Sequence, residues 1–371
     1  MDERYFIIAG EASGDKHAAE LIRQIRLRDP HARIAGLGGD RMEAAGCYLY
    51  RHIRHMAFMG FAAVIAHRNE IRDNFRIARE ALLNEQPRVL ILIDYPSFNL
   101  RIADFCRRHL PDTKIVYYIP PKVWAWKKRR VHQIAKLCDE VLGIFPFEPA
   151  FYAKYGYRCT YVGNPTAEEL GIGDRLLVIG DRTQTIALLP GSRESEIRHC
   201  LPKMLEAARR MKGYRIAVCA APNIDEALYR PYLSGHETLT HDTYGTLQHA
   251  SAAVVNSGTA TLETALLGCP QVAVYHLVCS RLIGLLRWAQ PIVFKIPYFT
   301  LVNILSGKEV IRECIAERFT VKNVADELQR LLTDAAYQKE MLASYEHLLT
   351  LLGDQPASVT AAERITSIAS A

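Results

Sequence analysis

The sequence lacks several patterns that define common classes of protein. Nine cysteines are scattered along 371 residues and none forms a C-x-x-C pair, which argues against a disulfide framework or a zinc ribbon and favours reduced, mostly buried thiols. No apolar run approaches the ~20 residues that cross a bilayer, and the N-terminus leads into a strand-like segment without a signal-peptide pattern. We therefore expect a cytoplasmic protein, or one bound to the surface of a membrane.

Motifs for metal, nucleotide and serine chemistry are missing as well. The 13 histidines are dispersed, and neither a D-x-D nor an H-E-x-x-H pattern occurs, so we expect no metal ion. The absence of G-x-G-x-x-G and of G-x-x-x-x-G-K-[ST] weakens a dinucleotide or P-loop interpretation. The absence of a G-x-S-x-G elbow weakens a hydrolase interpretation. We expect catalysis without a cofactor.

What is present is the composition of an ordinary globular protein, with 49% hydrophobic and 23% charged residues. A chain of 371 residues exceeds the size at which one hydrophobic core usually stops growing, so two domains are expected. The net charge of +6 suits anionic partners such as phosphates, acidic lipids or nucleic acid without choosing among them.

Short apolar runs alternate with helical patterns in two successive series. The first series is Tyr5–Ala9, Arg33–Leu37, Val89–Ile93, Ile115–Ile119 and Glu140–Ile144. The second is Thr185–Leu189, Arg215–Cys219, Ala253–Val255 and Val272–Tyr275. Such alternation predicts parallel sheets with helices on both faces.

The best linker between the two series is Gly163-Asn164-Pro165, because Gly and Pro interrupt both periodicities. We predict an α/β protein of two facing, doubly wound, Rossmann-like domains, residues 1–165 and 166–340, followed by a helical C-terminal segment, residues 341–371. In such folds ligands bind at the carboxyl ends of the strands.

Two motifs of the first domain lie at predicted strand ends. Gly10-Glu11-Ala12-Ser13-Gly14-Asp15 opens a helix whose free N–H groups suit a polar ligand, although a simple capped turn explains it equally well. Asp94 follows the apolar strand at residues 89–93. A carboxylate there can have a raised pKa and act as a general base, whereas the alternative is a helix cap, a role that Ser97 would fill equally well.

Two motifs of the second domain suit a diphosphate. In Pro190-Gly191-Ser192-Arg193, the glycine permits close backbone approach and the arginine offers a fork of donors, against the alternative of a surface turn. In the second motif, Ser257, Gly258 and Thr259 open a helix that also carries Glu263. These groups could hold a diphosphate and a ribose hydroxyl, or form a cap.

Two further segments bear on partners. Residues 122–130 interleave two tryptophans with five basic residues, as at nucleic-acid sites and membrane interfaces, or on a solvated basic helix face. Residues 56–66 carry no charge between basic flanks, so a buried helix and an acyl-chain site explain them equally well.

Taken together, six motifs in this order closely resemble the lipid-A-disaccharide synthase family over residues 5–315. They are Gly10–Asp15, Ile93-Asp94-Tyr95-Pro96, Val123-Trp124-Ala125-Trp126, Leu189–Arg193, Ser257-Gly258-Thr259-Ala260 and Asn303-Ile304-Leu305-Ser306-Gly307. The chain departs from the family pattern at Ser97, where many members carry a second acid, and at Pro120-Pro121-Lys122, where a Ser-Pro-Ser-like run is more usual.

The resemblance implies an inverting GT-B glycosyltransferase that joins UDP-2,3-diacylglucosamine to 2,3-diacylglucosamine 1-phosphate (lipid X), releasing UDP. It implies that Asp94 is the base and that Glu11, Arg193 and Asn303 serve activity or nucleotide binding. It also implies a peripheral association with the inner membrane, no nucleic acid, and a homodimer that can exchange C-terminal segments. The alternatives are a UDP-sugar 2-epimerase of the same fold and a nucleic-acid-binding protein that uses residues 122–130.

Overall fold

The computed structural model describes residues 3–56, 68–124, 130–171, 182–222, 224–256, 258–276 and 298–370. The chain forms two compact units, the first made of Met1–Glu168 with Asp354–Ala371 and the second of Glu169–Gly353. Each unit contains one parallel sheet, which confirms the predicted α/β class. The sequence predicted domain boundaries at residues 165 and 340, and the two units of the structure divide after residues 168 and 353.

The sheet of the first unit has seven strands in the order β3-β2-β1-β4-β5-β6-β7, all parallel. Their bounds are β1 Arg4–Ala9, β2 Arg33–Gly38, β3 Tyr48–His52, β4 Val89–Ile93, β5 Lys114–Tyr118, β6 Glu140–Gly143 and β7 Thr160–Tyr161. Strand β4 lies centrally and all of its residues are buried, as expected of a strand covered by helices on both faces.

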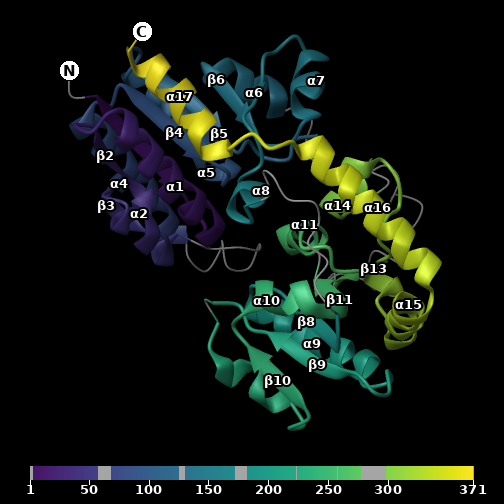
Figure 1. Cartoon of the computed structure of the whole chain (residues 1–371). Coiled ribbons are helices and arrows are strands. Elements are labelled where there is room, and N and C mark those ends of the chain that lie inside the picture. The colour runs from purple at the N-terminus through teal and green to yellow at the C-terminus, as the bar shows by residue number, and fades with distance from the viewer. Residues whose placement is uncertain are drawn as a thin grey trace. The chain divides into compact units, whose positions relative to one another are not determined.

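Helices cover both faces of this sheet (Figure 1). Tyr5 and Ile7 of β1 pack in the core with α1, α2 and α17, whereas Phe6 and Ile8 pack in the core with α4, α5, α6 and α7, because successive strand residues point to opposite faces. The bounds are α1 Ala12–Arg28, α2 Asp40–Ala44, α4 Arg68–Glu85, α5 Pro96–His109, α6 Arg130–Leu137, α7 Glu148–Ala153, α8 Pro165–Glu169 and α17 Ala357–Ser370, with the 3₁₀ helix η1 at Ile53–His55.

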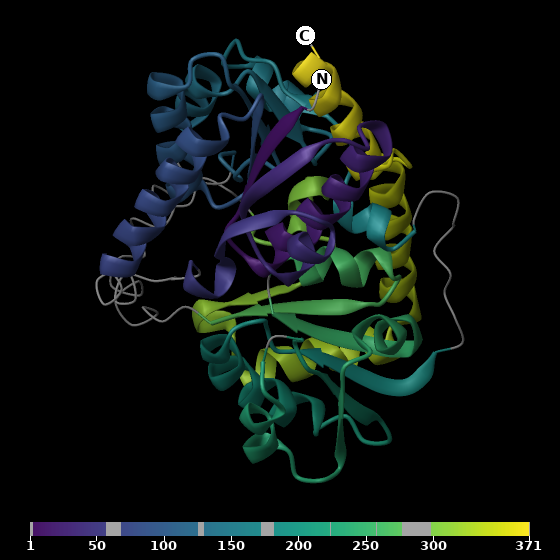
Figure 2. The same ribbon diagram turned by 90° about the vertical axis from the view of Figure 1, so that its left-hand side faces the viewer.

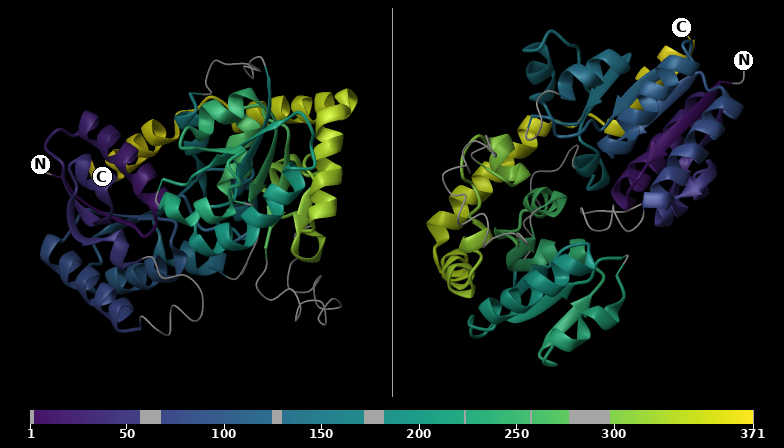
Figure 3. Two further views of the ribbon diagram at one scale, coloured as in Figure 1. Left: turned by 90° about the horizontal axis from the view of Figure 1, so that it is seen from below. Right: turned by 180° about the vertical axis from the view of Figure 1, so that it is seen from behind.

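The C-terminal helix α17 belongs to the first unit of the same chain. It packs along α1, and its Ala369 carbonyl accepts a hydrogen bond of 2.9 Å from Arg88 Nε. Figures 2 and 3 show both ends of the chain together on this unit. The last helix therefore closes one face of the first sheet.

The second unit has a six-stranded parallel sheet in the order β10-β9-β8-β11-β12-β13. Its strands are β8 Thr183–Leu189, β9 Arg215–Cys219, β10 Glu237–Thr240, β11 Ala250–Asn256, β12 Gln271–Tyr275 and β13 Glu313–Ile315. Helices α9 and α15 pack against each other and contact the central strands. Helices α10 and α11 also contact this sheet. The helices are α9 Glu194–Ala208, α10 Thr243–His249, α11 Thr259–Leu266, α14 Leu301–Ser306, α15 Val321–Thr333 and α16 Ala335–Leu352, with 3₁₀ helices at Glu226–Leu228, Arg230–Tyr232 and Ala316–Arg318.

Every predicted strand is present, and the strands that the sequence did not predict are β3, β7, β10 and β13. All cysteines in the described part of the chain are free, with Cys138 and Cys159 half-buried and the others buried. Among the described helices, none combines the length and the apolar character needed to span a bilayer.

Candidate functional site

Asp94 lies at the carboxyl end of β4, where the backbone makes a sharp turn. Asp94 has φ 41° and Tyr95 has φ 44°, a left-handed conformation that costs a residue with a Cβ atom roughly 1–2 kcal/mol. The Asp94 carbonyl accepts hydrogen bonds from Tyr117 Oη at 2.6 Å and Asn99 Nδ2 at 2.8 Å, and its N–H donates to Ile119 O at 3.1 Å. Contacts from α5 and β5 thus fix this peptide.

The neighbouring Tyr95 ties this turn to the predicted glycine motif. A Cβ atom at Gly10 would lie 2.3 Å from the Tyr95 ring, so only glycine allows the ring to lie there. The Tyr95 hydroxyl donates to Met56 O at 2.8 Å. The ends of β1 and β4, which are adjacent strands, are therefore locked together beside Asp94.

The electrostatic surroundings of Asp94 suit a proton acceptor. Its side chain reaches solvent, yet nearby protein displaces enough water to raise the pKa, against the opposing effects of the Lys122 charge and the Tyr95 N–H. The pKa of Lys122 is lowered by the same kind of desolvation, while Asp94 and Glu148 counteract that change. A carboxylate, an ammonium and a second carboxylate therefore influence one another at this sheet edge.

Glu148, the second carboxylate, is a residue that sequence reasoning missed. It is 1% exposed, and its oxygens accept hydrogen bonds from Ile144 N at 2.8 Å, Phe145 N at 3.0 Å and Trp124 Nε1 at 3.2 Å. Burial raises its pKa to about 7, against these hydrogen bonds and Lys122. Its position just after β6, at the carboxyl edge, is the signal that could have found it.

Trp124 corrects one expectation about the surface. Residues 122–130 were expected at a nucleic-acid site, at a membrane interface or on a solvated helix face, but Trp124 is 9% exposed and packs edge-on against Phe145 and Phe147. Its indole N–H is used by Glu148. Trp124 therefore belongs to the core, and Trp126 lies outside the described residues, as do residues 57–66 of the uncharged segment.

The first turn of α1 presents the predicted motif after β1. Glu11 precedes the helix with an extended backbone and is half-buried, and Ser13 is exposed. Gly14 is buried instead, and a Cβ atom there would meet Ala9 and Ile93 at ordinary contact distances. Ser13 is thus available to a ligand, whereas Gly14 faces the sheet.

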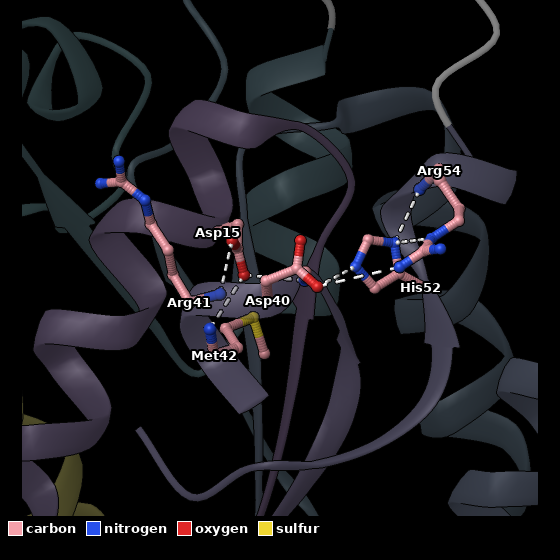
Figure 4. Close-up of polar contacts among 7 residues, drawn as sticks. Asp15, Asp40, Arg41, Met42, His52 and Arg54 are labelled. Carbon is pink, nitrogen blue, oxygen red and sulfur yellow. Dashed lines mark hydrogen bonds and ion pairs between the residues drawn. The ribbon is translucent and has the colours of Figure 1, made fainter. Parts of the chain in front are cut away.

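Asp15 has a structural use that the sequence did not suggest. It is 4% exposed and accepts hydrogen bonds from the backbone N–H groups of Gly39 at 2.7 Å, Met42 at 3.1 Å and Arg41 at 3.2 Å. Figure 4 shows dashed contacts from the Asp15 carboxylate to Arg41 and Met42, while Asp40 points toward His52. Asp15 was predicted to bind substrate, and in this structure its carboxylate orders the turn between β2 and α2.

In the second unit, Gly191, Ser192 and Arg193 follow β8 and precede α9. Gly191 has φ 124°, and a Cβ atom there would lie 2.4 Å from Glu196 Oε2 and 2.7 Å from Asn256 Nδ2. Glu196 accepts from Ser192 N at 3.0 Å and pairs with Arg193 at 2.7 Å. The Arg193 side chain is 47% exposed, so its guanidinium is oriented by Glu196 yet remains accessible.

The second turn of this unit lies at the end of the adjacent strand β11. Asn256, its last residue, approaches Gly191 and is 5% exposed. Gly258 and Thr259 are exposed at the start of α11, and Glu263 is half-buried one turn later, while Ser257 lies outside the described residues. The structure therefore brings the two predicted diphosphate turns together through Asn256, which sequence reasoning missed.

Asn303 is 0% exposed, whereas the resemblance implied a residue that serves activity or nucleotide binding. Its Nδ2 donates to Ile311 O and Glu313 Oε1, both at 2.9 Å, and its Oδ1 accepts from Val310 N at 2.8 Å and Ile311 N at 3.0 Å. These bonds use the side-chain amide fully. In this structure Asn303 fixes the segment that leads into β13.

Basic side chains of α9 lie beside the residue that follows β12. The rings of His199 and His276 stack with centroids 4.5 Å apart, and burial, together with His199 and Lys203, lowers the pKa of His276. Among the described residues, no group of three His, Cys, Asp or Glu side chains is arranged to hold a metal ion. The exposed Arg193 guanidinium and the backbone N–H groups at the starts of α9 and α11 make the edge of the second sheet suited to an anion.

Two parallel-sheet units with polar turns at the carboxyl ends of their strands are the architecture of GT-B nucleotide-sugar enzymes. The structure is similar to that of the calicheamicin glycosyltransferase CalG4, with a TM-score of 0.61 and 16% identity, covering 99% of this chain and 98% of that one. It is also similar to a UDP-GlcNAc 2-epimerase from Neisseria meningitidis, with a TM-score of 0.60 and 9% identity, covering 98% and 100%. These likenesses establish the fold.

Sequence comparison then identifies the family. The family model for lipid-A-disaccharide synthetase matches residues 5–367. A lipid-A-disaccharide synthase of Myxococcus xanthus is 35% identical, covering 98% of this chain and 97% of its own, and one of Trichlorobacter lovleyi is 36% identical, covering 95% and 94%. The chain belongs to the lipid-A-disaccharide synthetase family.

The family assignment decides among the functions left open by the sequence. It supports a glycosyltransferase that forms the lipid A disaccharide, and favours this function over both a UDP-sugar 2-epimerase and a nucleic-acid-binding protein. The epimerases share the fold at 9–12% identity only.

Proposed function

We propose that the enzyme transfers 2,3-diacylglucosamine from UDP to the 6-hydroxyl of 2,3-diacylglucosamine 1-phosphate, with inversion at the anomeric carbon. The observation that carries this proposal is Asp94, an accessible carboxylate with a raised pKa on a rigid turn at the end of β4. Inversion needs one base on the side of the incoming hydroxyl and one anion-stabilising site for the leaving diphosphate.

In the proposed reaction Asp94 takes the proton of the acceptor hydroxyl as the oxygen attacks the anomeric carbon. A raised pKa makes Asp94 a stronger base than an ordinary aspartate, since proton transfer improves as the pKa of the base approaches the working pH. Glu11 is half-buried at the neighbouring strand end. We assign it a supporting role in acceptor binding, together with Ser13.

The bond between the anomeric carbon and the diphosphate oxygen breaks as the new glycosidic bond forms, and UDP leaves with the electron pair. We assign the stabilisation of its negative charge to Arg193, the Ser192 hydroxyl and the N–H groups at the start of α11, including that of Thr259. A guanidinium and helix N-termini are suited to phosphate oxygens. Glu263, one turn into α11, is assigned to a ribose hydroxyl.

The test is direct reconstitution. The purified chain is incubated with UDP-2,3-diacylglucosamine and 2,3-diacylglucosamine 1-phosphate, and the products are analysed by mass spectrometry. The proposal requires a disaccharide 1-phosphate and one UDP per disaccharide. UDP release without the disaccharide, or turnover of UDP-GlcNAc in the absence of the acceptor, would contradict it.

Both substrates carry acyl chains, which supports a peripheral association with the inner membrane as a second part of the proposal. The wild type should float with vesicles that contain acidic phospholipids, and the bound fraction should fall as salt rises, because surface charges are screened. Failure to bind such vesicles at low salt would refute this part. Whether two copies form a homodimer is answered by light scattering on the same preparation, and we propose that they do.

A further inference from the structure

The main chain at Asp94 is held in a conformation that it would not adopt alone. Asp94 and Tyr95 are consecutive left-handed residues, neither of them glycine. Such conformations persist where surrounding contacts over-determine them, and they occur at functional sites. The contacts that select this conformation therefore also set the direction of the Asp94 side chain.

The Asp94 carbonyl oxygen is gripped by two buried side chains from different elements. Tyr117 of β5 donates its hydroxyl at 2.6 Å, and Asn99 of α5 donates its amide at 2.8 Å. The same amide reaches Ile93 O at 3.1 Å, which fixes the preceding peptide as well. Both donors are 0% exposed, so water does not compete for the carbonyl from their side.

We propose that Asn99 and Tyr117 are positioning residues for catalysis, which hold the Asp94 carboxylate toward the acceptor hydroxyl by fixing the Asp94 carbonyl. This inference rests on the proposed role of Asp94 as the base. Both side chains are fully buried, and each acts through the main chain of Asp94. If their role were only structural, the two donors would pair a buried carbonyl, and their removal would change activity only through the amount of folded protein.

Tyr117→Phe tests the proposal with the smallest change, since it removes one hydroxyl and keeps the ring in the core. Its matched control is Tyr152→Phe. Tyr152 is equally buried in the same core cluster, and its hydroxyl has no hydrogen-bond partner among the described residues. Asn99→Leu, which removes the other donor, is the second variant.

We expect Tyr117→Phe to lower kcat about 10- to 100-fold, because misplacing a reacting group by about 1 Å costs this much or more. KM for both substrates and the affinity for UDP should stay within about twofold of the wild type, since binding is made elsewhere. Tyr152→Phe should retain wild-type kcat. Asn99→Leu, if it folds, should act in the same direction as Tyr117→Phe.

The decisive measurement is a double-mutant cycle with Asp94→Asn. If Tyr117 acts through Asp94, Tyr117→Phe should change kcat by less than about twofold in the Asp94→Asn background, because the group that it positions has already lost its function. An equal loss in both backgrounds would overturn the proposal, and so would wild-type kcat for Tyr117→Phe.

The role of Asp94 as the base and the positioning role of Tyr117 are refuted by different results. Wild-type kcat for Asp94→Asn would remove Asp94 as the base, and with it the need for positioning. A severe loss for Asp94→Asn together with full activity of Tyr117→Phe would leave the base in place and refute the positioning role alone.

Discussion

The carboxyl edges of the two sheets carry different chemical groups. In the first unit, the edge carries Asp94, Glu11 and the buried Glu148, with raised pKa values at Asp94 and Glu148. In the second, it carries the exposed guanidinium of Arg193 and the backbone N–H groups at the start of α11. One edge favours the uptake of a proton and the other favours the binding of an anion.

Backbone geometry differs in the same way. The first edge places side-chain-bearing residues in the left-handed region, namely Asp94, Tyr95 and Ile119, whereas the turn after β8 uses Gly191 with φ 124°. A strained non-glycine residue is retained where its side chain is needed, and a glycine suffices where the backbone itself approaches a ligand. The first edge therefore presents a side chain, whereas the second presents N–H groups and cations.

The largest expected effect comes from removing the base. Asp94→Asn keeps the size and hydrogen-bonding reach of the side chain but cannot accept the proton, so kcat should fall by roughly 10²–10⁴-fold. The affinity for UDP and the melting temperature should stay near those of the wild type, because the second edge is unchanged.

Asp104→Asn is the control for that variant, since Asp104 is an exposed carboxylate of α5 that pairs with Arg108. It should be fully active. Near-wild-type kcat for Asp94→Asn, with the product confirmed by mass spectrometry, would break the division between the edges and direct the search for the base to Glu11.

The next effect in size concerns the anion-binding edge. Arg193→Ala should weaken UDP binding about 10- to 100-fold, since a charge-assisted hydrogen bond contributes about 1.5–3 kcal/mol. Arg198→Ala, which removes an arginine of α9 that pairs with Glu194, should leave the affinity unchanged. Calorimetry with UDP measures both, and equal affinities for the wild type and Arg193→Ala would remove Arg193 from the nucleotide site.

The sequence predicted the central strands of both sheets and missed the outermost strands, for a physical reason. Strands β3, β7, β10 and β13 are the outer strands of their sheets. Central parallel strands are buried on both faces and appear as apolar runs, whereas edge strands are short and mixed in polarity. Strand β10, with the sequence Glu-Thr-Leu-Thr and only partial burial, carries too weak a pattern to separate it from a loop.

The candidate site was predictable where a residue stands at a strand end, and not where its partners come from elsewhere. The positions of Asp94 and Arg193 follow from the strands before them. Asp15 and Asn303 resemble ligand-binding residues in the sequence, yet their side chains are taken up by Gly39–Met42 and by Val310–Glu313. Such pairings depend on tertiary packing, which periodicity does not encode.

The smallest expected effect comes from removing a charge that lowers the pKa of Asp94. Among the charged groups that influence Asp94, Lys122 lowers the pKa, opposing desolvation. Lys122→Met removes this charge, so the pKa of Asp94 should rise. Because Asp94 must be deprotonated to act as a base, the acid limb of the kcat–pH profile should move to higher pH, and the variant should approach wild-type kcat in alkaline buffer.

Lys136→Met, which removes an exposed charge from α6 of the same unit, should leave the acid limb in place. Glu148 also interacts with Lys122, and burial raises its own pKa to about 7, so Glu148 is a second group whose titration Lys122→Met would change. In the Glu148→Gln background the Lys122→Met shift should therefore persist if it acts on Asp94, and vanish if Glu148 carries it. An acid limb that stays fixed or moves to lower pH in Lys122→Met would show that the Lys122 charge does not set the pKa of the base.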